Sequence, residues 1–153
     1  MSPAVFIDAN VPIYAAGGAH PYKEPCSRIL RMAAAEPQAF VSDSEVLQEL
    51  MHRYLASGRW EQGRMVVHAF AEVMDGRVES VLAEDVLSAA RLADRHPDVS
   101  ARDLVHAAVM QRLGAGRIIS ADTDFDSLTG IERLDPARVE EWERSILSDP
   151  YRA

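Results

Sequence analysis

The sequence predicts an α/β fold, a three-layer α/β/α domain around a short and mostly parallel central sheet. Short apolar runs such as residues 4–7 have the length and composition of strands that are covered on both faces. Longer segments with their apolar residues on one helical stripe alternate with these runs, which is typical of a parallel sheet with helices on both sides. The chain has 153 residues and shows no repeat or long linker, so we expect a single domain over residues 1–153.

Cap and turn residues indicate where the expected helices begin and end. Pro12 suits the start of a helix, and Gly17 and Gly18 end that short segment. Ser42 and Glu45 form a capping box that opens another helix, and Ser100 caps a third. We expect strands at residues 4–7, 39–41, 78–82, 117–120 and 131–134. We expect the remaining helices at residues 22–35, 42–55, 60–74, 84–95, 100–113 and 136–147.

The composition argues against several classes of protein. A net charge of −8 is unlike that of a protein that coats nucleic acid through bulk positive charge, although a local site could still act on nucleic acid. The single cysteine, Cys26, cannot form an intrachain disulfide, which favours a reducing compartment. The sequence shows neither a signal peptide nor an apolar run long enough for a membrane helix. We therefore expect a cytoplasmic protein that does not enter a membrane.

Charge is distributed unevenly along the chain. Residues 20–70 carry six cations and six anions, whereas most of the excess negative charge lies in residues 71–153. An anionic partner is therefore tolerated best by the first half of the chain. Arginine is well suited to binding phosphate through two parallel hydrogen bonds. The arginines expected to be available for such contacts are Arg28, Arg31, Arg53, Arg59 and Arg64.

Two aspartates directly follow expected strands. Asp8 comes after the first apolar run, and Asp122 follows a later strand in the same way. In an open parallel sheet, ligands bind beyond the carboxyl ends of the strands, where both side chains would lie. A turn or a helix cap explains either aspartate alone equally well, but the pair favours a functional site. Glu49 and Asp103 lie in expected helices, where a solvated glutamate and a capping-box aspartate after Ser100 are the alternative explanations.

Four segments of the chain carry a resemblance to a known family. They are FIDANVPIYAAG, SDSEVLQELMHRY, SARDLVHAAVM and IISADTDFDSLTGI. In this order and spacing they resemble PIN-domain ribonucleases, and in particular the VapC-type toxins of toxin–antitoxin pairs. Each motif is short, but the resemblance extends from Ala4 to about Leu134. It implies a PIN-like domain that hydrolyses RNA phosphodiester bonds.

The resemblance also implies which residues form the site. The acidic quartet of the family falls on Asp8, Glu49, Asp103 and Asp122. Asp124 is the expected fifth member, with Asp126 as the less favoured alternative. Asn10 matches a small polar position after the first aspartate, and Ser120 matches a hydroxyl position before the fourth acid. Both are expected to fix the orientation of the carboxylates.

Such a group of carboxylates is expected to bind a divalent cation, because converging negative charges repel one another without one. All-oxygen ligation selects Mg²⁺, for which Mn²⁺ can substitute, over zinc. Glu49 would bind a second ion or orient the attacking water, and one ion or two both remain open. No histidine has the spacing of a metal motif, and His106 is expected to be a core or partly exposed residue. The expected metal ligands are Asp8, Asp103, Asp122 and Asp124.

The partners also follow from the resemblance. Single-stranded or loop RNA is the expected substrate, because unstacked bases are what proteins read in RNA. The family's toxins are held inactive by a cognate antitoxin protein that covers the crevice, and they commonly form homodimers.

Three alternative functions are weighed against this interpretation. A stand-alone PIN nuclease of RNA processing would carry the same residues. A catalytically silent PIN-like module that only binds protein is disfavoured, because all four acids are present. A haloacid-dehalogenase-like phosphatase also places an aspartate after its first strand. The phosphatase reaction needs a second aspartate two residues after the first, and this position is Asn10 here. It also needs a suitably placed lysine, and Lys23, the sole lysine of the chain, is not suitably placed.

Overall fold

The computed structural model describes residues 3–147 and is built around a parallel sheet of five strands. The strand order is β3-β2-β1-β4-β5, and each pairing between these neighbours is parallel. β1 lies in the centre and its three residues are buried, as expected for a strand covered on both faces. The strands are β1 (Val5–Ile7), β2 (Phe40–Asp43), β3 (Val78–Glu79), β4 (Arg117–Ile119) and β5 (Glu132–Leu134).

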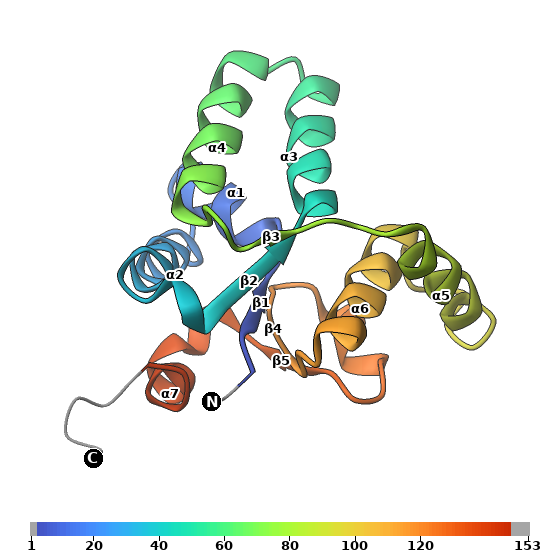
Figure 1. The fold of residues 1–153 in the computed structure, drawn as a ribbon. Helices are drawn as coiled ribbons and strands as arrows, with labels where there is room; N and C mark the ends of the chain where they lie inside the picture. Colours follow the sequence, from blue (N-terminus) through green and yellow to red (C-terminus); the bar gives the residue numbers. More distant parts are fainter. Residues whose placement is uncertain (1–2, 148–153) are drawn as a thin grey trace.

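Helices cover both faces of this sheet, which confirms the predicted three-layer α/β/α fold (Figure 1). In this view α1, α2 and α7 lie on one side of the sheet, α5 and α6 lie on the other, and α3 and α4 extend from one end as a hairpin. None of the helices within residues 3–147 has both the length and the apolar composition needed to cross a lipid bilayer. The helices are α1 (Asn10–Ala16), α2 (Lys23–Ala35), α3 (Ser44–Ala56), α4 (Trp60–Val73), α5 (Ala83–Ala93), α6 (Ala101–Leu113) and α7 (Val139–Trp142).

The start of α3 differs from the prediction. The predicted capping box of Ser42 and Glu45 is wrong, because Ser42 belongs to β2 and its Oγ donates a hydrogen bond to the backbone oxygen of Ile7 at 2.9 Å. The N-cap is Asp43, whose side chain accepts a hydrogen bond from the backbone N–H of Val46 at 3.0 Å. The strand therefore continues two residues further than expected, and its last residue, Asp43, also caps the helix.

The start of α1 also differs from the prediction. The helix begins at Asn10 rather than at Pro12, so that the chain turns from strand to helix almost without a loop. Pro12 still lies in the first turn, where its missing N–H costs no hydrogen bond. The early start holds the Asn10 side chain close to the end of β1.

The predicted helix over residues 136–147 is not continuous. The short α7 lies between two 3₁₀ turns, Pro136–Arg138 and Glu143–Ser145. Val139 and Trp142 are buried, but the acidic residues around them leave little apolar surface to hold a longer helix against the core. The indole Nε1 of Trp142 donates to the backbone oxygen of Asp135 at 2.9 Å and ties the segment to the end of β5.

The α3–α4 hairpin depends on one very close approach between its helices. Gly63 of α4 is buried against Tyr54 of α3, and a Cβ atom at this glycine would lie 2.6 Å from Cγ of Tyr54. Tyr54 itself is only 1% exposed. The absence of a side chain at Gly63 therefore sets how closely the two helices pack.

Candidate active site

The carboxyl edge of the parallel sheet holds a concentration of acidic side chains. Asp8 directly follows β1, Asp43 is the last residue of β2, and Asp122 lies just beyond β4. Because these three strands are parallel neighbours, their ends meet at one edge. Two helices bring further acids toward it: Glu49 from α3 and Asp103 from α6.

Asp8 is held by a network of hydrogen bonds and is only 3% exposed. Its Oδ1 accepts from the backbone N–H of Ala9 at 2.8 Å, and its Oδ2 accepts from Oγ of Ser120 at 2.6 Å and from Nδ2 of Asn10 at 3.1 Å. Ser120 Oγ in turn accepts from the backbone N–H of Asp122 at 3.0 Å. Asn10 and Ser120 therefore both contact the Asp8 carboxylate. They are the two residues that the sequence predicts to orient the carboxylates of the site.

Three aspartates form the first of two groups that could hold a metal ion. One oxygen from each of Asp103, Asp122 and Asp124 lies within 4.8 Å of the others. Burial, the nearby Asp8 carboxylate and a hydrogen bond with Asp122 raise the pKa of Asp103 to about 8. This donor set consists of oxygens only, and its mutual repulsion is what a hard divalent cation would relieve. The residues present therefore fit the Mg²⁺ that the sequence predicts.

The second group combines Asp8 and Glu49 with a histidine that the sequence interpretation expected to be a core or partly exposed residue. Ligand atoms of Asp8, Glu49 and His106 lie within 4.8 Å of one another. The Nε2 atom of His106 lies 3.7 Å from Oδ1 of Asp8 and 3.7 Å from Oε2 of Glu49. His106 is fully buried, as predicted, but its ring faces the acids rather than apolar side chains alone.

Asp43 is a second residue that the sequence interpretation missed. Its Oδ2 lies 2.8 Å from Nδ1 of His106, and both side chains are completely buried. Burial opposes the charged imidazolium, but the hydrogen bond to Asp43 and the facing carboxylates of Glu49 and Asp8 outweigh it and raise the pKa of His106 well above its ordinary value. His106 follows Asp103 by one helical turn, and this spacing is the signal that could have placed both side chains on the same face of α6.

The remaining predicted residues lie outside the two groups or beside them. Asp126 is bound by Arg133 through two hydrogen bonds, at 3.0 and 3.2 Å, and belongs to neither metal-holding group. Arg28 pairs with Glu143 at 2.5 Å, on the side of the molecule where α2 meets the segment after α7. By contrast, Arg53 lines a pocket together with Glu49, His52 and Arg102. Arg53 is thus a predicted phosphate-binding arginine that lines the same pocket as Glu49.

The pKa of Asp103 gives the metal-free protein a specific pH dependence. Between the ordinary pKa of an aspartate and about 8, the folded protein holds a proton on Asp103 that the unfolded chain has released. The free energy of unfolding should therefore fall as the pH rises through this window, by up to about 1.4 kcal/mol per pH unit. We expect Asp103→Asn to flatten this decrease between pH 5 and pH 8, measured by urea unfolding in the presence of a chelator.

The matched control for this experiment is Asp98→Asn, which removes an exposed carboxylate before α6. The control should keep the slope of the unmodified protein. An equal slope for Asp103→Asn and the unmodified protein would contradict the assignment of the proton to Asp103.

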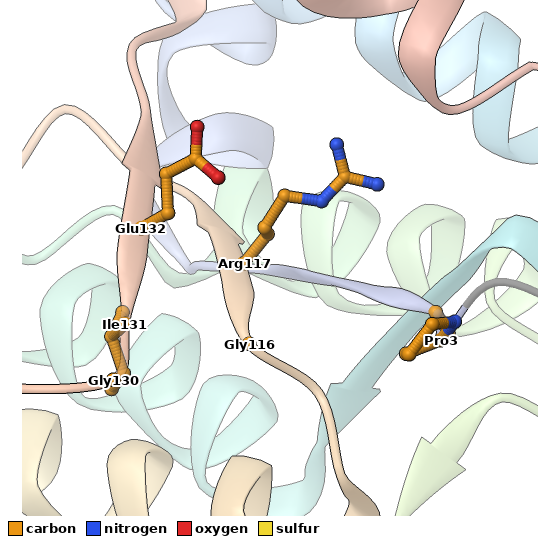
Figure 2. Close-up of a pocket in the computed structure, with 7 residues that line it drawn as sticks. Pro3, Gly116, Arg117, Gly130, Ile131 and Glu132 are labelled. Carbon is orange, nitrogen blue, oxygen red and sulfur yellow. The ribbon is translucent and has the colours of Figure 1, made fainter.

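A pocket at the opposite edge of the sheet has a different character. Figure 2 shows it between the residues that precede and begin β4 and β5, with the chain near the N-terminus on one side. Arg117 and Glu132, which are paired neighbours in the sheet register, contribute its charged side chains. A single carboxylate beside an arginine does not make a metal site. Among the described residues, the two groups that could hold a metal ion therefore lie at the carboxyl edge of the sheet.

Comparisons with known proteins identify relatives of this chain. Ribonuclease VapC13 of Mycobacterium tuberculosis is 38% identical to this chain over 130 residues, which cover 85% of this chain and 98% of VapC13. The solved structure of Mycobacterium tuberculosis VapC20, described as a sarcin–ricin loop cleaving toxin, has a TM-score of 0.63 at 22% identity and covers 81% of this chain and 94% of its own.

A second solved structure, a toxin–antitoxin complex from Klebsiella pneumoniae, has a TM-score of 0.61 at 16% identity and covers 87% of this chain and 98% of its own. These two structures share the fold. The PIN domain family model matches residues 5–131. With this match and the identity to VapC13, the chain belongs to the PIN domain family and, within it, to the VapC ribonucleases.

Proposed function

We propose that this protein is a metal-dependent endoribonuclease that hydrolyses phosphodiester bonds of single-stranded or loop RNA, and that it is the cytoplasmic toxin of a toxin–antitoxin pair. One observation carries the proposal. Carboxylates from β1, α3, α6 and the segment after β4 lie in two adjoining groups at one edge of the sheet. The named activity of the relatives supports the same reaction.

The proposed catalytic residues are those that form these groups. Asp8, Asp103, Asp122 and Asp124 would hold Mg²⁺, or Mn²⁺ in its place, and Glu49 would hold a second ion or orient water. A bound ion of this kind supplies an activated water and stabilises negative charge on phosphate oxygens. Asn10 and Ser120 keep the Asp8 carboxylate in one orientation by donating to its Oδ2. This fixed orientation supports the proposal, because a metal-binding carboxylate is normally held by its own hydrogen bonds.

A path for the RNA strand is available beside Glu49. The pocket there is lined by Arg53, Arg102, His52 and Glu49, among others. Arg102 lies 3.6 Å from Oε1 of Glu49, and Arg53 is exposed and lines the same pocket as Glu49. Arginine binds phosphate oxygens in pairs. We propose that these two arginines hold the phosphates next to the scissile bond and offset the repulsion between RNA and an acidic site.

The proposed protein partners are a cognate antitoxin and a second copy of this chain. Two groups of exposed apolar side chains support protein partners, because such patches commonly mark interaction surfaces. The first group lies on the α3–α4 hairpin and the second at the start of α5. Their members are Met51, Leu55 and Met65 in the first group and Leu82, Val86 and Leu87 in the second. The toxin–antitoxin complex that shares the fold supports the antitoxin as a partner.

The proposal predicts cleavage of RNA that depends on a divalent ion. The purified protein should cut single-stranded RNA from a cellular preparation in Mg²⁺ or Mn²⁺, stop cutting when a chelator is added, and resume when the ion is restored. Mapping the new RNA ends would identify the target. Cleavage that persists in chelator would contradict the metal mechanism. The absence of any new ends with either ion would contradict the ribonuclease assignment.

A further inference from the structure

Two buried polar atoms at the site have no hydrogen-bond partner among the described residues. They are Nε2 of His106 and Oε2 of Glu49, and they face each other at 3.7 Å. Buried polar atoms are almost always paired, so each exception requires an explanation. Oδ1 of Asp8 also lies 3.7 Å from the same nitrogen. The two unpaired atoms and the Asp8 oxygen therefore converge on one point.

The ring of His106 is fixed so that Nε2 points at this convergence. On its other side, Nδ1 lies 2.8 Å from Oδ2 of Asp43. The carboxylate of Asp43 also accepts from the backbone N–H of Val46 as the cap of α3, so it acts as an acceptor toward both neighbours. Nδ1 must then carry a hydrogen, and an ion that displaces the Nε2 proton of the metal-free ring meets a lone pair on that nitrogen. The Phe6 ring packs against the imidazole, with 5.2 Å between the ring centres.

A buried carboxylate behind the far nitrogen is the usual support of a metal-binding histidine, because it fixes the tautomer and increases the basicity of the ligand atom. We propose that Asp8, Glu49 and His106 form a mixed oxygen–nitrogen site for a first-row transition metal ion such as Mn²⁺, with Asp43 as the positioning residue of the histidine. This inference deepens the proposed function, since it names the ion class of one half of that site.

The observed separations fit this assignment. Ligand atoms bound at about 2.0–2.2 Å to a common ion lie at most about 4.4 Å apart. Both 3.7 Å separations from Nε2 are within that limit, and they are longer than the roughly 3.2 Å upper bound of an ordinary N–H···O hydrogen bond. A protonated ring would therefore form ion pairs with both carboxylates but no hydrogen bond of ordinary length, whereas one shared ion would contact all three atoms directly.

The neighbouring group gives an internal contrast. Asp103, Asp122 and Asp124 offer oxygen atoms only, the set that suits Mg²⁺. Imidazole nitrogen instead favours transition metals. The two adjoining groups should thus differ in ion preference, and the group containing His106 should bind Mn²⁺ in preference to Mg²⁺.

The direct test uses the unmodified protein. Metal-free protein labelled with ¹⁵N-histidine is titrated with Mn²⁺ and examined by pulsed electron paramagnetic resonance. We expect a nitrogen coupling typical of a bound imidazole, which changes with the isotope of the label. A spectrum of bound Mn²⁺ without any histidine coupling overturns the inference, whether or not the protein cleaves RNA.

Variants provide the second measurement. His106→Asn keeps an amide donor that can reach Asp43 but has no atom at the Nε2 position, and we expect the ratio of Mn²⁺ to Mg²⁺ affinity in calorimetric titration to fall at least about 10-fold. Asp43→Asn should lower the same ratio about 10-fold, because it removes only the support of the ring. His68→Asn is the matched control, since His68 is exposed on α4 and belongs neither to the two metal-holding groups nor to the pocket beside Glu49, and its ratio should stay within about 2-fold of the unmodified protein.

The outcomes separate this inference from the proposed function. An unchanged affinity ratio in His106→Asn overturns the mixed site even where Mg²⁺-dependent RNA cleavage is present. Histidine coupling to Mn²⁺ without cleavage of any RNA supports the site and contradicts the ribonuclease proposal. Where the two variants do not fold, the spectrum of the unmodified protein decides.

Discussion

Replacing Asp8 with asparagine is expected to reduce the rate of RNA cleavage by about 100-fold or more. Asp8 belongs to the group that includes Glu49 and His106, and it also lies close to Asp103. The substitution removes the negative charge of the Asp8 side chain. It also places an amide N–H₂ group against N–H or O–H donors that bind the carboxylate in the unmodified protein. A metal ion contributes several kcal/mol to such a reaction, and each 1.36 kcal/mol is a factor of ten in rate.

The measurement is the initial rate of cleavage of one RNA substrate in saturating Mn²⁺. Asp126→Asn is the matched control, because it makes the same chemical change in an aspartate that is bound by Arg133 and belongs to neither metal-holding group. The control should retain a rate within about 2-fold of the unmodified protein. A rate for Asp8→Asn within the same range would remove Asp8 from the proposed catalytic residues.

Gly63→Ala is expected to destabilise the protein by about 1–3 kcal/mol. An alanine in an exposed helix would stabilise it slightly relative to glycine, but here the added Cβ meets the buried Tyr54 side chain at less than van der Waals distance. Relief requires α3 and α4 to move apart or Tyr54 to leave its position. The melting temperature should fall by about 3–10 °C, as judged from circular dichroism, for a chain of this size.

Gly18→Ala controls for the chemical change itself. This glycine lies after α1, has no atom within 4 Å of an added Cβ and needs no unusual backbone conformation. Its melting temperature should stay the same or rise slightly, because alanine restricts the unfolded chain. An unchanged melting temperature for Gly63→Ala would show that the hairpin can absorb a methyl group, and that the close approach does not determine its packing.

Much of the fold could be predicted from local sequence signals. The buried strand β1 is a continuous apolar run, β4 contains two buried isoleucines, and the Ser100 cap of α6 is a local pattern that the structure confirms. The cap of α3 was predicted wrongly because both Ser42 and Asp43 are good cap residues. The choice between them depends on a tertiary contact, the bond from Ser42 to the neighbouring strand. The helix expected after residue 136 is broken because the acidic residues around the buried Val139 and Trp142 leave little apolar surface to hold a longer helix.

The candidate site shows the same division between local and tertiary information. Strand ends and the family resemblance placed Asp8 and Asp122 at one edge, and the structure brings Glu49 and Asp103 to the same edge. Asp43 and His106 were missed because they are 63 positions apart in sequence, and their bond joins the end of β2 to the middle of α6. No periodicity or motif links two such positions. Only the packing of α6 beside the sheet does so.

One helix supplies a ligand candidate to each of the two groups. Asp103 and His106 are three residues apart on α6, a spacing that brings side chains onto one face of a helix. The geometric relation between the oxygen-only group and the mixed group is therefore set by a rigid backbone rather than by loops. Insertions or deletions in the turns around the site should alter which RNA enters, while the relative placement of the two ion positions is preserved.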